Sequence, residues 1–401
     1  MSEWKCYKLN EISSLSNGIN FDKSAYTSGV KLIGVSDFKN RIHPDYDSLQ
    51  EVDSKVVKSG DYLEKGDIVF VRSNGNKELV GRCMMIDRDI PVTYSGFCIK
   101  LRLNDKKIFD PVFFNYLFKT RQFKKSMTGT AVGANIQNLS QSRLGSCEVN
   151  VPDIEIQKEI ATILSRYDSL IENYQKQIKL LEEAAQRLYK EWFVDLHFPG
   201  HETTKIIDGV PEGWEKKKLV EIADIVMGQS PKSEYYNNEF KGLPFHQGVG
   251  SYGNRFVADN TYSTSFTRIA EPNSVLFSVR APVGRLNITK NKVVIGRGLA
   301  AMTHKKGYQS YLFYLLKERF FKDNIIGNGA IFASISKDEL HKLEFTTPTD
   351  DLAIRFNTIA GNLDDEIMKA DSQIRLLTEA RDRLLPKLMS GGIIKNEDYE
   401  L

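Results

Sequence analysis

The residues of this sequence that could act as acids, bases or nucleophiles do not form a catalytic set. Pro152, Asp153, Glu155 and Lys158 resemble a nuclease motif of the Pro-Asp…Glu-x-Lys type, but the final spacing is one residue too long. They also stand at the start of a predicted helix, where acidic residues are stabilised by the helix dipole. We therefore interpret them as a helix N-terminus.

The histidines give no better candidate for catalysis or for metal binding. His197 and His201 are four residues apart, but Pro199 and Gly200 between them prevent the helix that would bring them together. The sequence contains no Gly-x4-Gly-Lys-Ser/Thr phosphate-binding loop and no Asn/Asp-Pro-Pro-aromatic motif for amino-group methylation. We predict a chain that is not an enzyme and binds no metal or cofactor.

Arginines and small-residue loops point instead to nucleic acid. Residues 73–76, 128–135 and 326–331 are rich in Gly, Asn, Ser, Thr and Ala, so their backbone N–H groups could approach phosphates closely. Arginine and the side-chain amides can also pair with base edges in the major groove. The candidate DNA-binding residues are Arg72, Ser73, Asn74, Asn76, Lys77, Arg82, Thr130, Asn135, Gln137, Arg280, Arg285, Arg297 and Asn328. The simpler alternative is ordinary turns with scattered surface arginines.

Charge is unevenly distributed along the chain. Residues 1–153 hold 22 basic and 18 acidic side chains, and residues 214–349 hold 19 and 12. The stretches 154–213 and 350–401 each hold 7 basic and 11 acidic side chains. Two basic regions alternate with two acidic regions, and basic regions suit a polyanionic partner.

The chain repeats itself. Residues 177–188 read QIKLLEEAAQRL and residues 373–384 read QIRLLTEARDRL, an offset of 196 residues. The opening of each half also matches, at an offset of 210: WKCYKLNEI from residue 4 and WEKKKLVEI from residue 214. The offset drifts in the regions between, as expected where loops absorb insertions.

Each half is predicted to contain an α+β module. Strand-like runs cover residues 30–35, 67–72, 81–86 and 92–103, and in the second half 243–249, 274–280, 285–289 and 292–303. One amphipathic helix follows in each half, over residues 111–127 and 309–325.

A long helix ends each half. Apolar residues recur at alternating steps of four and three after Pro152 and Pro348, which predicts a coiled-coil seam. The interface candidates are Leu164, Tyr167, Ile171, Tyr174, Ile178, Leu181, Leu363, Ile367, Ile374, Leu377 and Leu384. A short connection favours antiparallel pairing. In that register Arg381 faces Tyr167, and we expect the Tyr167 ring or hydroxyl, or solvent, to satisfy its charge.

These elements give a complete domain plan. The expected fold class is α+β, with two tandem-repeated mixed α/β modules joined by two long antiparallel coiled-coil helices in pseudo-two-fold symmetry. The expected segments are module 1 (residues 1–153), helix 1 (154–195), a linker (196–213), module 2 (214–349), helix 2 (350–390) and a tail (391–401).

Composition limits where such a chain could work. The sequence contains no apolar run of the length that a membrane span needs and no apolar stretch after its first residues, so we expect a cytoplasmic protein. Its four cysteines, Cys6, Cys83, Cys98 and Cys147, fit no metal spacing, so we expect free thiols.

Taken together, these features resemble the specificity subunit of a type I restriction–modification system. The resemblance is carried by the duplicated Trp-x4-Leu-type opening, the small-residue loop before each helix, the entry VP…QKEIA from residue 151, and the tail with Leu180, Leu181, Arg187 and Leu188. It covers about residues 1–390. The second helix departs from the entry pattern, because residues 351–356 read DLAIRF.

The resemblance implies a DNA-recognition role. Each module would recognise one half of a bipartite duplex site, while the helices fix the gap and dock two methyltransferase subunits, through which motor-nuclease subunits join. S-adenosylmethionine would serve the methyltransferase, and ATP and Mg²⁺ the motor-nuclease. The alternative is a protein-interaction scaffold whose duplicated modules bind protein, with no direct DNA recognition. Strong salt dependence of DNA binding would separate the two.

Overall fold

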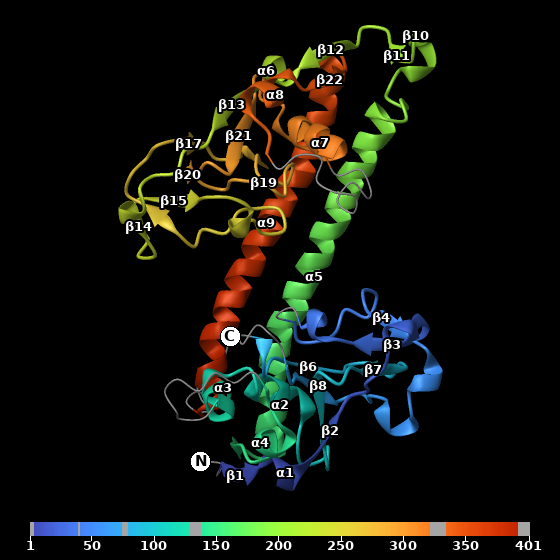
Figure 1. The fold of residues 1–401 in the computed structure, drawn as a ribbon, viewed down its shortest axis with the longest axis vertical. Helices are drawn as coiled ribbons and strands as arrows, with labels where there is room; N and C mark the ends of the chain where they lie inside the picture. Colours follow the sequence, from blue (N-terminus) through green and yellow to red (C-terminus); the bar gives the residue numbers. More distant parts are fainter. Residues whose placement is uncertain (1–3, 39–40, 74–78, 129–137, 321–333, 392–401) are drawn as a thin grey trace, which may run out of the picture. The chain divides into compact units, whose positions relative to one another are not determined.

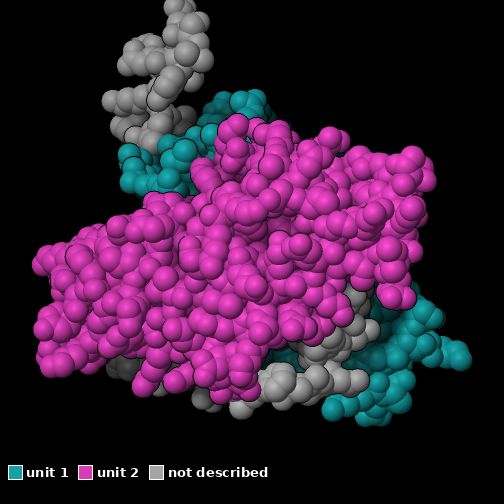
Figure 2. Space-filling view, turned by 90° about the horizontal axis from the view of Figure 1, so that it is seen from above, with its two compact units in different colours: residues 1–174, 373–401 teal, residues 175–372 magenta. Residues whose placement is uncertain are grey.

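The computed structural model describes residues 4–38, 41–73, 79–128, 138–320 and 334–391 (Figure 1). The chain forms two compact units, which Figure 2 shows in different colours. Unit 1 comprises residues 1–174 and 373–401, and unit 2 comprises residues 175–372. Each unit therefore contains one module together with part of each long helix, a division that differs from the segments expected from the sequence.

Unit 1 is built on a four-stranded antiparallel sheet in the order β2-β8-β5-β6. A three-stranded sheet, β4-β3-β7, and the strand pair β1-β9 complete its β structure. The strands are β1 (Lys5–Lys8), β2 (Ser13–Asn17), β3 (Tyr26–Ile33), β4 (Gln50–Val52), β5 (Ile68–Val71), β6 (Cys83–Met85), β7 (Val92–Tyr94), β8 (Cys98–Leu103) and β9 (Glu148–Val151). The helices of the module are α1 (Leu9–Ile12), α2 (Pro111–Leu117), α3 (Arg121–Thr128) and α4 (Gln141–Gly145).

Unit 2 repeats this plan with the four-stranded antiparallel sheet β13-β21-β18-β19. Its second sheet has five strands, β14-β16-β15-β20-β17, and β12 pairs with β22. The strands are β10 (Ile206–Ile207), β11 (Val210–Pro211), β12 (Glu215–Lys218), β13 (Ala223–Met227), β14 (Tyr236–Asn237), β15 (Leu243–His246), β16 (Tyr262–Ser263), β17 (Ile269–Ala270), β18 (Val275–Ser278), β19 (Leu286–Ile288), β20 (Val293–Ile295), β21 (Leu299–His304) and β22 (Glu344–Thr347). The module's helices are α6 (Leu219–Ile222), α7 (Gln309–Phe320) and α8 (Lys337–Lys342).

The central strands explain why the two sheets form alike. Every residue of β5 and of β18 is buried, as expected for a strand covered on both faces. The register also matches, because Ile68 pairs with Met85 in unit 1 and Val275 pairs with Ile288 in unit 2. Strand pairing therefore identifies equivalent residues of the two units in a region where the offset between the two sequence copies changes.

Three expected elements are interrupted. The runs 92–103 and 292–303 each form two strands, separated by turns at residues 95–97 and 296–298, so the prediction of single strands is wrong. The helix expected over residues 111–127 is likewise divided into α2 and α3. Each turn contains a glycine packed closely against a side chain: a Cβ on Gly96 would lie 2.0 Å from the side-chain oxygen of Asn20, and one on Gly296 would lie 2.6 Å from that of Gln247, so these side chains would have to move.

The long helices are α5 (Ile154–Phe193) and α9 (Asp350–Met389). In unit 1, Ile160 and Leu164 of α5 and Leu388 of α9 join one apolar core. In unit 2, Tyr189 of α5 and Phe356 of α9 belong to another, with their rings 5.6 Å apart. All eleven candidate interface residues are buried or half-buried: Leu164, Tyr167, Ile171, Tyr174, Ile178, Leu181, Leu363, Ile367, Ile374, Leu377 and Leu384.

The prediction that Tyr167 or solvent would satisfy the charge of Arg381 is wrong, both in the residue and in the kind of group. Its guanidinium pairs with the carboxylate of Asp168, the neighbour of Tyr167, and also with Asp382. A buried guanidinium is best satisfied by a carboxylate, which matches its charge as well as its hydrogen bonds. An aromatic partner could have supplied only a weaker interaction.

Membrane spans and metal sites can be assessed only in the described part of the chain. None of its helices combines the length and the apolar content that a membrane crossing needs. Among the same residues, no three His, Cys, Asp or Glu side chains lie where they could hold a metal ion. All four cysteines are free, with Cys6 exposed and the other three buried.

Candidate nucleic-acid interface

In unit 1, the candidate residues Arg72 and Ser73 lie where the central strand β5 ends. Both backbone N–H groups point to the carbonyl of Phe97, at 2.8 and 3.3 Å, and the Arg72 guanidinium donates to the carbonyl of Gly96 at 3.3 Å. Ser73 also forms a bridge with Asn138. The end of the sheet thus gathers Arg72, Ser73 and the turn between β7 and β8.

That turn presents an aromatic ring that sequence reasoning missed. The Phe97 side chain is 62% exposed although its backbone is held by the end of β5. An exposed ring on a backbone held in this way offers a face on which a base can stack. The signal was available in the sequence, because Phe97 follows the glycine that breaks the strand-like run.

In unit 2, the equivalent sheet end carries arginines in the turn and beside it. Val279 donates to the carbonyl of Gly298 at 2.9 Å, and Arg280 forms a bridge with Ser334. Val279 therefore occupies the position of Arg72, and Arg280 occupies that of Ser73. Arg280 and Arg297 are both exposed, and the backbone bonds hold them near each other at this edge.

The glycines on both sides of Arg297 allow its backbone to pack closely against the neighbouring chain. A Cβ at Gly298 would lie 2.5 Å from the carbonyl oxygen of Gln247, so the backbones approach too closely for any side chain. The Arg297 N–H donates to the Ser230 hydroxyl at 3.2 Å. The backbone is thereby fixed while the guanidinium stays in solvent, as a phosphate or base contact requires.

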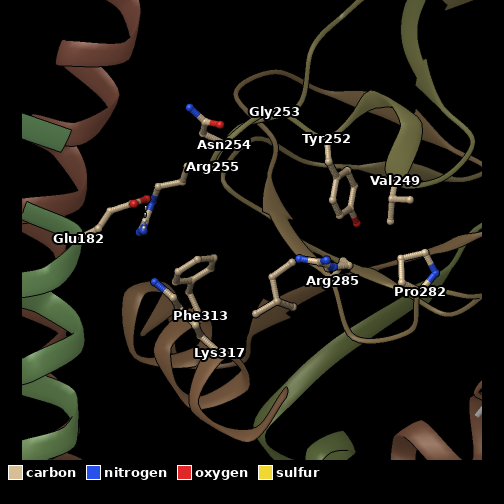
Figure 3. Close-up of a pocket in the computed structure, with 11 residues that line it drawn as sticks. Glu182, Val249, Tyr252, Gly253, Asn254, Arg255, Pro282, Arg285, Phe313 and Lys317 are labelled. Carbon is tan, nitrogen blue, oxygen red and sulfur yellow. Dashed lines mark hydrogen bonds and ion pairs between the residues drawn. The ribbon is translucent and has the colours of Figure 1, made fainter. Parts of the chain in front are cut away.

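Arg82 and Arg285 form a second equivalent pair, each following a glycine with positive φ in a tight turn. Gly81 has φ 79° and Gly284 has φ 87°, a conformation that favours glycine. Arg285 lines a pocket of about 380 Å³ in unit 2, with Lys317 and Phe313 from α7 (Figure 3). Arg82 lines a larger cavity of about 920 Å³ in unit 1.

Each cavity also contains a lysine from the module's main helix region, Lys119 in unit 1 and Lys317 in unit 2. Burial lowers the pKa of both. Lys119 donates to the carbonyls of Arg41 and Cys83, at 3.2 and 2.7 Å. The Lys317 ammonium lies 5.8 Å from the centre of the Tyr314 ring. Lys119 is thus held by protein carbonyls, and Lys317 packs on an aromatic ring.

The structure brings together only some of the candidate residues. It gathers Arg72 with Ser73, and Arg280 with Arg297, at equivalent sheet ends, and it places Arg82 and Arg285 in equivalent cavities. Seven further candidates lie outside the described residues: Asn74, Asn76, Lys77, Thr130, Asn135, Gln137 and Asn328. Arg255, a buried cation lining the pocket of Figure 3, was not anticipated, because nothing in its sequence context marks it.

Known proteins match this chain over most of its length. The family model described as type I restriction modification DNA specificity domain matches residues 1–183 and 211–354. The putative type I restriction enzyme MjaX specificity subunit of Methanocaldococcus jannaschii is 31% identical over 339 residues, which cover 82% of this chain and 78% of that protein. The type I restriction enzyme HindI specificity subunit of Haemophilus influenzae is 24% identical and covers 98% of this chain and 100% of its own.

A solved structure has a similar fold. The S subunit of a type I restriction–modification system from M. genitalium superposes with a TM-score of 0.61 at 18% identity, covering 96% of each chain. The family model matches two regions, and each contributes a four-stranded sheet of the same order. The chain belongs to the family of type I restriction–modification specificity subunits, whose role is to determine DNA sequence specificity.

Proposed function

We propose that each module recognises one half of a bipartite duplex site. The observation that carries this proposal is the equivalence of the two sheet ends. In unit 1 this edge presents Arg72, Ser73 and the exposed Phe97, and in unit 2 it presents Arg280 and Arg297. Equivalent frames with different side chains suit recognition of two different sequences by one type of module.

The long helices act as a spacer in this proposal, paired as an antiparallel coiled coil with pseudo-two-fold symmetry. Contacts inside each unit support that direction. In unit 1, Asp168 of α5 pairs with Arg381 of α9. In unit 2, Trp192 of α5 packs on Phe356 of α9, with ring centres 6.1 Å apart. The partner's residue number falls as the α5 number rises, as antiparallel helices require, and a rigid pair of about 60 Å would hold the half-sites at one gap.

The catalytic steps belong to partner subunits in this proposal. Two methyltransferase subunits dock on the helices and use S-adenosylmethionine, and motor-nuclease subunits that join through them use ATP and Mg²⁺. The chain itself supplies recognition and carries no catalysis, which is consistent with the absence of a recognisable catalytic set in its sequence. Membership of the specificity-subunit family supports this division of labour.

Removal of the exposed arginines in unit 2 tests the proposal. We expect Arg280→Ala with Arg297→Ala, in the complex with methyltransferase subunits, to weaken DNA binding. The slope of log affinity against log salt should fall by about one for each arginine that had neutralised a phosphate. Sequencing of methylated sites should show relaxed specificity in one half-site only. Arg88→Ala removes an exposed arginine of the other module that pairs with Asp87, away from the long helices, and serves as the control.

Three results would count against this proposal. Unchanged affinity, salt slope and methylated sites in the double variant would remove the assigned interface. Binding insensitive to salt would favour the alternative of a protein-interaction scaffold. Relaxation of both half-sites together would contradict the assignment of one half-site to each module.

A further inference from the structure

Each long helix contains a largely buried aspartate at an equivalent position: the Asp168 side chain is 10% exposed and the Asp364 side chain 17%. Asp168 of α5 and Asp364 of α9 are 196 residues apart, the offset of the helix repeat. The Tyr116 hydroxyl, from the module of unit 1, donates to Asp168. The Tyr314 hydroxyl of unit 2 donates to Asp364 at 3.1 Å. In both units, the module therefore contacts its helix through a tyrosine and an aspartate.

A buried carboxylate needs a compensating cation, and the two units obtain it from different places. In unit 1 the cation is Arg381, which comes from the other long helix. In unit 2 it is Arg255, which comes from the module, pairs with Asp364, and lies 3.4 Å from Glu182 of α5. The Arg255 side chain is only 2% exposed, and its guanidinium lies 4.3 Å from the centre of the Phe313 ring.

The register shows which residue replaces each arginine in the other unit. Met85 and Ile288 are equivalent, and their N–H groups donate to Ile42 at 3.0 Å and to Arg255 at 2.9 Å. Ile42 therefore stands in unit 1 where Arg255 stands in unit 2.

The 196-residue offset identifies the other exchange. It places Ala185 of α5 where Arg381 stands in α9, and Ala185 is fully buried in the core of unit 2. In unit 1 the arginine, Arg381, is on the helix and the module has Ile42. In unit 2 the arginine, Arg255, is on the module and the helix has Ala185. Each unit retains one arginine for its buried aspartate.

We propose that the location of this arginine specifies which module packs on which pair of helix segments. A module with Ile42 on the helices that carry Ala185 would bury Asp364 without an arginine to pair with it. A module with Arg255 on the helices that carry Arg381 would bury two guanidinium groups beside Asp168. Both mismatches are unfavourable, because an uncompensated buried charge is strongly destabilising. The arginine thereby favours packing of each module on its own helix segments over packing on those of the other unit.

Relocating the arginine in the full-length chain tests this specificity. We expect Arg255→Ile and Arg381→Ala each to lower Tm by roughly 10 °C, the consequence of leaving a buried carboxylate unpaired in a unit of this size. Combining Arg255→Ile with Ala185→Arg, or Arg381→Ala with Ile42→Arg, should recover at least half of the loss. Arg383→Ala, which removes an exposed pair with Glu379, serves as the control and should leave Tm unchanged.

A second pair of variants separates charge from packing. Combining Arg255→Ile with Asp364→Asn, or Arg381→Ala with Asp168→Asn, should also recover Tm, because the buried charge is then absent. Losses that merely add in every double variant would overturn the proposal. Recovery with asparagine but never with relocated arginine would overturn the assignment of modules to helices, leaving a simple ion pair. These Tm measurements need no DNA, so they stand apart from failure of the proposed recognition function.

Discussion

The two units share an apolar frame and differ where that frame meets solvent or the long helices. Their four-stranded sheets have the same order, and their central strands are equally buried. The turn between the equivalent strands presents Phe97 in unit 1 and Arg297 in unit 2, both fixed by glycine. Backbone geometry is retained while exposed side chains differ, as the proposed recognition of two different half-sites requires.

The same comparison applies to the helix cores. Phe356 of α9 stands where α5 has Ile160, and both are fully buried. Phe356 lies among aromatic rings, with Phe193 at 5.1 Å and Tyr189 at 5.6 Å between ring centres. Unit 2 thus uses an aromatic cluster where the equivalent residue of unit 1 is aliphatic.

Truncation at this position should have the largest effect of the three changes considered. We expect Phe356→Ala to lower the free energy of unfolding by about 4 kcal/mol and Ile160→Ala by about 3 kcal/mol, from lost burial and the cavity left behind. Denaturant unfolding followed by tryptophan fluorescence and circular dichroism measures both. Equal losses would show that the aromatic cluster adds nothing beyond burial, and Phe356→Leu should cost less than either.

A second difference concerns how each long helix holds the start of the module's main helix. In unit 1, Gln157 accepts from the Asp110 N–H at 2.8 Å and donates to the Ile108 and Pro152 carbonyls. In unit 2, Asn357 accepts from the Ser310 and Tyr311 N–H groups, at 3.0 and 3.3 Å. The 196-residue offset places alanines, Ala353 and Ala161, at the opposite positions.

Removing these amides should have intermediate effects of unequal size. Gln157 is only 1% exposed, so Gln157→Ala would leave buried N–H and carbonyl groups unpaired, at a cost of about 2 kcal/mol. Asn357 is half-buried, and Asn357→Ala should cost about 1 kcal/mol because water can replace part of its role. Hydrogen exchange of the α2 and α7 amides should show the loss locally. Equal protection in both variants would contradict the predicted inequality.

Features of the fold that depend on many residues could be predicted from the sequence, whereas contacts between a few residues could not. The repeat and the heptad pattern depend on many residues, so the long helices and the repeated α+β modules were predictable. Single contacts were not, since the pairing of Arg381 with Asp168 depends on one helical step that a heptad pattern does not resolve. Arg255 was missed because its partners, Glu182 and Asp364, are distant in sequence.

The expected exposed arginines show a similar limit. Residues 68–72 and 275–280 are similar and both end in arginine, yet the hydrogen bonds of the two sheets make Arg72 equivalent to Val279. A shift of one residue turns a side chain to the other face of a strand, so an alignment without a fixed register cannot assign it. Glycine turns were the better indicator, because Gly96 and Gly298 flank the exposed Phe97 and Arg297.

The smallest expected effect depends on pH and arises because unit 2 has His304 where unit 1 has Leu103. Both begin equivalent strand pairings, with Ala223 and Ser13. Burial, with a further contribution from the charge of Lys306, lowers the pKa of His304 from 6.5 to about 4. Above pH 6.5 the ring is neutral in both folded and unfolded chains. As pH falls from 6.5 towards 4, the unfolded chain binds the proton first, so stability is lost in that window.

Replacing His304 with the residue of unit 1 should remove this loss. We expect the wild-type chain to lose about 1 kcal/mol more than His304→Leu between pH 7 and pH 5, a figure reduced for the partial solvent access of the ring. Unfolding of both chains across that range measures the difference in slope. Identical slopes would mean that His304 accepts a proton in the folded unit as readily as in the unfolded chain. In that case neither Leu103 nor His304 would make the stability of its unit depend on pH in this range.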